Sequence, residues 1–142
     1  MDNNKNVVSR EDKIKQRRNA REIAFKLVFE YTFNNEENRD MLEEHIEGVL
    51  PDNVSYINEV YFGVISHYDE LIEHIKTNTQ NFALDRIFKV DLALLLLALY
   101  EIIYMEKIPY KVSVDEALTL AEKYSTEKSS NYINGVLAKF SR

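Results

Sequence analysis

The sequence contains no cysteine, and it has only three glycines and two prolines among its 142 residues. Without cysteine the chain can form no disulfide, thiolate zinc site or iron–sulfur cluster, and it has no cysteine nucleophile. All-β folds and glycine-rich phosphate-binding loops need more turn residues than this. The composition therefore favours long helices joined by short connections.

Long apolar runs are also missing. The first five residues are polar and lack the apolar stretch of a signal peptide. The most apolar run, residues 92–100, is far shorter than the ~20 residues that span a bilayer. These features predict a cytoplasmic protein that does not enter a membrane, and residues 92–100 are interpreted as a buried central helix.

Apolar residues at helical spacing predict an all-α fold of about seven helices in two linked helical bundles. Residues 1–10 are expected to be a disordered tail, followed by an N-terminal bundle over 11–77 and a C-terminal bundle over 81–142. The expected helices cover residues 11–33, 39–50, 55–76, 82–88, 91–106, 113–124 and about 126–140. Gly63 and Gly135 are interpreted as points of close helix packing.

No arrangement of residues indicates catalysis. The three histidines lack the spacing of helical metal ligands, and no glycine-rich loop or Ser/His/Asp set is present. The many carboxylates between residues 36 and 73 fall on predicted exposed helix faces, where acidic runs are normally solvated. We therefore predict no enzymatic activity, no catalytic residue, no metal site and no cofactor.

The charge of the chain is unevenly distributed. The net charge of −6 divides into +3 over residues 1–33, −11 over residues 34–106 and +2 over residues 107–142. In the basic N-terminal helix, Lys13, Arg17 and Arg21 form a stripe at i, i+4 and i+8. Localised positive charge of this kind indicates an anionic partner.

Aromatic residues accompany the positive charge in two places. Arg18 lies in line with Phe25 and Phe29, and a basic turn beside aromatic rings suits single-stranded RNA, because cations neutralise phosphates and rings stack on bases. Lys128 and Tyr132 at the start of the last helix, with Tyr124 before it, form a second candidate. The alternative in both places is that the rings fill the core and the cations are simply solvated.

Several motifs resemble the NusB family of bacterial transcription antitermination factors. They are Arg17-Arg18-Asn19-Ala20-Arg21-Glu22, Val90-Asp91 with Leu99-Tyr100-Glu101-Ile102, Ile108-Pro109-Tyr110-Lys111-Val112 with Asp115-Glu116-Ala117, and Tyr132-Ile133-Asn134-Gly135-Val136-Leu137. They occur in the family's order and span nearly the whole chain. The resemblance implies a non-enzymatic, all-helical protein that binds boxA-type single-stranded RNA together with NusE, a small-subunit ribosomal protein. That complex helps RNA polymerase to resist termination, notably on ribosomal RNA operons.

The resemblance also implies which residues act. Those at RNA-contacting positions are Arg17, Arg18, Arg21, Phe29, Tyr124, Lys128 and Tyr132. Asn19 replaces an arginine of the family's basic cluster, and Lys13 and Lys15 are expected to compensate. Asp91 matches an acidic position at the partner interface. Two alternatives are a helical protein-interaction module without sequence-specific RNA binding, and a homodimer that covers the RNA-binding face.

Overall fold

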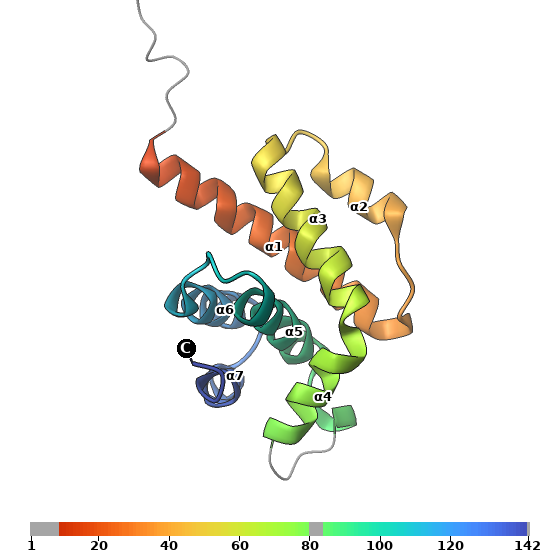
Figure 1. The fold of residues 1–142 in the computed structure, drawn as a ribbon, viewed down its shortest axis with the longest axis vertical. Helices are drawn as coiled ribbons and strands as arrows, with labels where there is room; N and C mark the ends of the chain where they lie inside the picture. The colour runs from red at the N-terminus through yellow and green to blue at the C-terminus, as the bar shows by residue number, and fades with distance from the viewer. Residues whose placement is uncertain (1–8, 80–83, 142) are drawn as a thin grey trace, which may run out of the picture.

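The computed structural model describes residues 9–79 and 84–141, which form seven α-helices and one short 3-10 helix (Figure 1). The elements are α1 (Arg10–Asn34), α2 (Arg39–Ile46), α3 (Pro51–Ser66), α4 (Tyr68–Asn78), η2 (Leu84–Arg86), α5 (Lys89–Tyr104), α6 (Tyr110–Tyr124) and α7 (Glu127–Ala138). The predicted all-α fold with seven helices is confirmed.

Helix α5 forms the centre of the fold. Its residues from Asp91 to Ile102 are all buried, and it packs against α1, α3, α4, α6 and α7. A helix that is apolar on all sides must be enclosed by other elements, and its leucines also favour the helical conformation. The prediction that residues 92–100 form a buried central helix is therefore confirmed.

The helix ends follow capping chemistry. The side chain of Ser9 accepts a hydrogen bond from the Asp12 amide at the start of α1, and that of Thr126 accepts one from the Ser129 amide at the start of α7. Helix α6 begins at Tyr110, three residues before the start predicted at Ser113. Ser113 is buried inside the helix instead, where it donates a hydrogen bond to a carboxylate of α5.

Three predicted helices differ in the structure. The described part of the short helix predicted over residues 82–88 contains only the 3-10 helix Leu84–Arg86. Residues 55–76 were predicted as one helix, but α3 and α4 are separated at His67, whose backbone (φ −109°, ψ 20°) leaves the helical region. The imidazole of His67 stacks on the Tyr104 ring, 4.2 Å between centroids. Helix α2 ends at Ile46 rather than residue 50, and Gly48 follows with φ 79°, a conformation that favours glycine.

The two helical glycines differ in their surroundings. A Cβ on Gly63 would overlap the Tyr100 ring, so the predicted close packing of another helix is confirmed there. A Cβ on Gly135 would meet no atom within 4 Å, so the close packing predicted for Gly135 is wrong. The sequence pattern did not distinguish the two, because each glycine lies inside a helix and directly before a valine of its apolar face.

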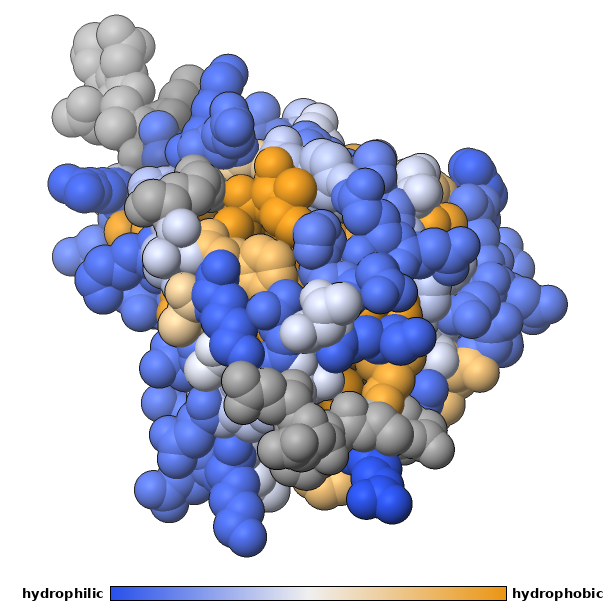
Figure 2. Space-filling view, turned by 60° about the horizontal axis from the view of Figure 1, so that its bottom comes forward, coloured by the Kyte–Doolittle hydropathy of each residue, from blue (hydrophilic) through white to orange (hydrophobic). Residues whose placement is uncertain are grey.

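The predicted division into two bundles falls at residues 78–81, which lie partly outside the described residues, and it stays a prediction. Most of the predicted tail also lies outside them. No helix in the described ranges is both long and apolar enough to cross a bilayer. On the face shown in Figure 2, hydrophilic side chains surround limited patches of hydrophobic ones.

Candidate functional site

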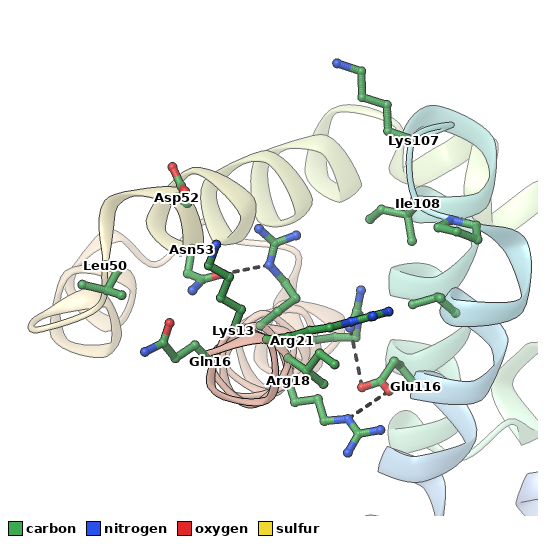
Figure 3. Close-up of a pocket in the computed structure, with 15 residues that line it drawn as sticks. Lys13, Gln16, Arg18, Arg21, Leu50, Asp52, Asn53, Lys107, Ile108 and Glu116 are labelled. Atoms are coloured by element: carbon green, nitrogen blue, oxygen red, sulfur yellow. Dashed lines mark hydrogen bonds and ion pairs between the residues drawn. The ribbon is translucent and has the colours of Figure 1, made fainter. Parts of the chain in front are cut away.

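The cationic residues predicted on α1 point to three different places. Lys13 and Arg17 lie towards the start of α3, Arg18 reaches α6, and Arg21 points into the core (Figure 3). The predicted stripe of Lys13, Arg17 and Arg21 is therefore not one solvent-facing surface. Each of the three arginines has its own side-chain partner in the structure.

A groove of about 610 Å³ opens between α1, the start of α3 and the loop joining α5 to α6 (Figure 3). It is lined by Arg10, Lys13, Ile14, Gln16, Arg17, Arg18, Arg21, Leu50, Asp52, Asn53, Lys107, Ile108, Pro109, Val112 and Glu116. Six of these side chains are cationic and two are acidic. The groove therefore has an excess of positive charge although the whole chain is acidic.

Arg17 is held against α3. Its Nε donates a hydrogen bond to Asn53 Oδ1 at 2.7 Å, and its guanidinium carbon lies 4.6 Å from the centroid of the Tyr56 ring. The side chain is half-buried. Hydrogen bonding and cation–π contact together orient the guanidinium at the edge of the groove.

Arg21 is buried, with 3% of its surface exposed. Its Nε donates to Glu101 Oε2 at 2.8 Å and its Nη2 to Glu101 Oε1 at 3.3 Å. Tyr56 and Ser113 also donate hydroxyl hydrogen bonds to the Glu101 carboxylate, which is fully buried. This network joins α1, α3, α5 and α6 and leaves Arg21 inaccessible to a ligand on the surface.

The electrostatics of this network favour the charged guanidinium. Burial alone would lower the pKa of Arg21, but the attraction of the Tyr56, Glu101 and Glu116 oxygens leaves it raised above its usual value. Burial raises the pKa of Tyr56 well above its usual range, and the Glu101 charge adds to this effect. Tyr56 therefore stays protonated and donates its hydrogen bond.

On the other side of α1, charged pairs connect the helix to α6. Arg18 Nε lies 3.1 Å from Glu116 Oε2, and the Arg18 side chain is 58% exposed. Lys123 Nζ donates to Glu22 at 2.7 Å, and the Tyr124 hydroxyl donates to the same carboxylate oxygen. These hydrogen bonds lower the pKa of Glu22, so its negative charge is matched by Lys123.

Aromatic rings form a row along α1 next to these pairs. The Phe25 ring lies 5.2 Å from Tyr124 and 6.0 Å from Phe29, and Phe29 lies 5.1 Å from Phe33. Phe25 is buried, as the core-packing alternative expected, whereas Phe29 is half-buried and Tyr124 is exposed. The rings of Phe29 and Tyr124 line a surface hollow together with Phe88.

A second hollow, of about 300 Å³, lies at the start of α7. It is lined by Arg86, Ile87, Phe88, Asp91, Lys128, Ser129 and Tyr132. Lys128 is exposed, and Tyr132 is half-buried. Burial and the nearby Asp91 charge raise the pKa of Tyr132 to about 12, so its hydroxyl stays neutral at physiological pH.

Asp91 is buried in the first turn of α5, with 4% of its surface exposed. Its carboxylate accepts hydrogen bonds from the Ser125 hydroxyl at 2.9 Å and the Ser129 hydroxyl at 2.8 Å. The predicted partner-binding carboxylate therefore joins α5 to the loop between α6 and α7. The neighbouring Phe88, by contrast, is 65% exposed.

Sequence reasoning missed Glu101, Tyr56 and the exposed Phe33 and Phe88 as residues that shape these surfaces. A signal for Glu101 was present, because it is a carboxylate directly after the most apolar run of the chain, and a buried carboxylate needs a cationic partner. No signal of comparable strength marked Phe33 or Phe88, since exposure of a single aromatic residue cannot be read from helical periodicity.

Comparisons with known proteins identify the relatives of this chain. The model of the NusB family matches residues 18–142. The transcription antitermination protein NusB of Natranaerobius thermophilus is 40% identical over 126 residues, covering 85% of this chain and 91% of that protein. The protein of the same name from Clostridium botulinum strain Hall is 40% identical over 139 residues, covering 87% and 97%.

Solved structures share the fold. T. maritima NusB superposes with a TM-score of 0.81 at 29% identity, covering 87% of this chain and 89% of that one. A chain from a crystal structure of the antitermination factors NusB and NusE in complex with dsRNA has a TM-score of 0.79 at 22% identity, covering 89% and 96%. The chain therefore belongs to the NusB family and is a non-enzymatic transcription antitermination protein.

Proposed function

We propose that this protein binds boxA-type single-stranded RNA together with NusE in the cytoplasm, as part of an RNA polymerase antitermination complex. Family membership supports this function. The observation that carries the proposal is the combined aromatic and cationic surface along α1, α6 and α7. There, Phe29 and Tyr124 line one hollow together with Phe88, and Phe88 also lines the hollow that contains Lys128. The exposed Arg18 lies earlier on the same helix as Phe29.

This surface suits a single strand better than a duplex. Aromatic rings stack on unpaired bases, and lysine and arginine contact the phosphates between them. Tyr132, whose hydroxyl remains protonated, extends the surface at the start of α7. Lys13 and Arg17 are proposed to contact RNA from the basic end of α1, whereas the buried Arg21 is proposed to act by holding the helices in position.

We place the NusE contact on a neighbouring patch, defined by Phe33, Phe88 and Lys89. The two rings are 61% and 65% exposed, and Lys89 Nζ lies 5.6 Å from the Phe33 ring centroid. Exposed aromatic rings beside a cation are typical of protein interfaces. In this proposal, Asp91 contributes by fixing the loop that borders the patch rather than by a direct contact.

The test of RNA binding measures affinity for a boxA RNA and a scrambled RNA, with and without NusE, over a range of salt concentrations. We expect tighter binding to boxA that NusE strengthens further. The Arg18→Ala/Lys128→Ala double variant should bind more weakly. Its plot of log affinity against log salt should be shallower by about 1.4, because each lost phosphate contact on a single strand contributes roughly 0.7.

The control for this test is Arg39→Ala on α2, a helix that contributes no residue to the proposed surface, and the Arg39 side chain is 70% exposed. Its affinity and salt dependence should equal those of the unchanged protein. Equal affinity for both RNAs with NusE present would favour the protein-interaction module instead. A dimer by light scattering that dissociates on RNA addition would favour the homodimer alternative.

The partner patch has its own test. We expect Phe88→Ser to weaken NusE binding by about tenfold or more, because truncating a central aromatic contact typically costs at least 1.4 kcal/mol. Phe88 occupies the N-cap of α5 without a side-chain cap, and serine can supply one, so the variant should fold. Isothermal titration with purified NusE measures the effect. Unchanged affinity would place the NusE contact elsewhere.

A further inference from the structure

The groove beside α1 has an aliphatic rim as well as positive charge. Among the described residues, six large hydrophobic side chains are exposed. Three of them line this groove: Ile14 is 47% exposed, Leu50 is 48% exposed and Val112 is 39% exposed. They come from α1, the start of α3 and α6, so three separate elements bring aliphatic side chains to one opening (Figure 3).

Leu50 is an unfavourable residue for the helix end that it occupies. It is the N-cap residue of α3 and makes no side-chain hydrogen bond there. Serine, threonine, aspartate and asparagine stabilise this position, whereas leucine is among the least favourable residues. The same side chain is nearly half exposed to water. Leu50 therefore destabilises the start of the helix and also exposes an apolar side chain to water. Residues that break local stability rules in this way are expected at functional sites.

The charges in the groove are unbalanced. Glu116 is already paired with Arg18 at 3.1 Å and lies 3.6 Å from Arg21. Lys13 and Lys107 make no ion pair within the described ranges 9–79 and 84–141. Asp52, the other acidic residue that lines the groove, makes no ion pair in those ranges either, so two carboxylates line the groove with six cationic side chains. Acidic groups entering the groove would therefore meet an excess of positive charge.

We propose that this groove binds an acidic peptide segment of a protein partner that also presents aliphatic side chains. Leucine-like side chains pack on Ile14, Leu50 and Val112, and carboxylates of the segment face Lys13 and Lys107. The rim favours a peptide over RNA, because bases stack on aromatic rings and the exposed rim residues are all aliphatic. The basic end of the proposed RNA surface shares Lys13 and Arg17 with this groove, whereas the aromatic rings of that surface, Phe29 and Tyr124, do not line the groove.

The experiment uses a fluorescein-labelled synthetic peptide with leucines at helical spacing and glutamates elsewhere, titrated with the full chain. We expect saturable binding that weakens at least tenfold when lysine replaces glutamate or serine replaces leucine in the peptide. The Leu50→Ser/Val112→Thr variant should also bind about tenfold more weakly. Leu50→Ser alone should raise the thermal midpoint by a few degrees, since serine caps α3.

The matched control is Phe88→Ser, which makes the same kind of change at the exposed N-cap of α5, outside the groove. It should leave peptide affinity unchanged, and Leu50→Ser/Val112→Thr should leave boxA RNA affinity unchanged. The proposal is overturned by absence of saturable binding at millimolar protein, or by equal binding of the lysine peptide. Unchanged peptide affinity of the Leu50→Ser/Val112→Thr variant would also overturn the proposal. If boxA RNA displaces the peptide in that case, the peptide binds to the RNA surface instead.

Discussion

Replacing Arg21 by alanine is expected to lower the free energy of unfolding by about 3–5 kcal/mol, because it leaves the buried Glu101 carboxylate without its cation. Most domains are stable by only about 5–15 kcal/mol, so this single change removes a large share of the total. Urea denaturation followed by circular dichroism measures the difference.

Two further variants separate this effect from a general loss of positive charge. Arg18→Ala breaks an ion pair whose arginine is 58% exposed, and it should cost no more than about 1 kcal/mol. The double variant Arg21→Met/Glu101→Leu removes both buried charges and should recover most of the stability. A cost below about 1 kcal/mol for Arg21→Ala would contradict the buried network as the structure describes it.

The expected instability affects how RNA-binding data are interpreted. Since Arg21 is 3% exposed, weaker RNA binding by Arg21→Ala would report a loosened fold rather than a lost phosphate contact. Arg18→Ala and Lys128→Ala are the informative variants, because both side chains are exposed. Helical spacing alone had placed Arg21 in one stripe with Lys13 and Arg17.

The helical architecture was predictable from sequence because it depends on local signals. Scarce glycine and proline, the apolar run of residues 92–100 and the polar breaks between apolar patterns all report on the nearby chain. The break at His67 escaped detection because apolar spacing continues across it. The imidazole of His67 stacks on the Tyr104 ring of another helix, and this contact leaves no local sequence pattern. Contacts between residues that are far apart in the chain leave no such local pattern in the sequence.

The candidate site was predictable in part. Helical spacing placed Phe25 and Phe29 on one side of the helix, and their ring centroids lie 6.0 Å apart. The same spacing could not show that Arg21 points inwards, because its direction depends on Glu101, which lies 80 positions away in the sequence. Likewise, the exposed leucine at the start of α3 becomes informative only when the helix start is known.

Gly63→Ala is expected to lower the free energy of unfolding by about 1–3 kcal/mol, because the added methyl group overlaps the Tyr100 ring. Alanine alone favours the helical conformation by about 1 kcal/mol over glycine, but overlap with a buried ring outweighs that gain. The Tyr100 ring is enclosed by His67 and Tyr104 at centroid distances of 6.2 and 5.1 Å, which limits its freedom to move aside.

Gly135→Ala provides the matched comparison, since it adds the same methyl group to helix α7 in open space. Without a neighbour within 4 Å, only the helical preference of alanine remains, and stability should rise by about 0.5–1 kcal/mol. Urea denaturation of both variants should therefore give changes of opposite sign. If both variants were stabilised, the Tyr100 ring would have to rearrange at little cost, and the close approach of α3 and α5 would not be rigid.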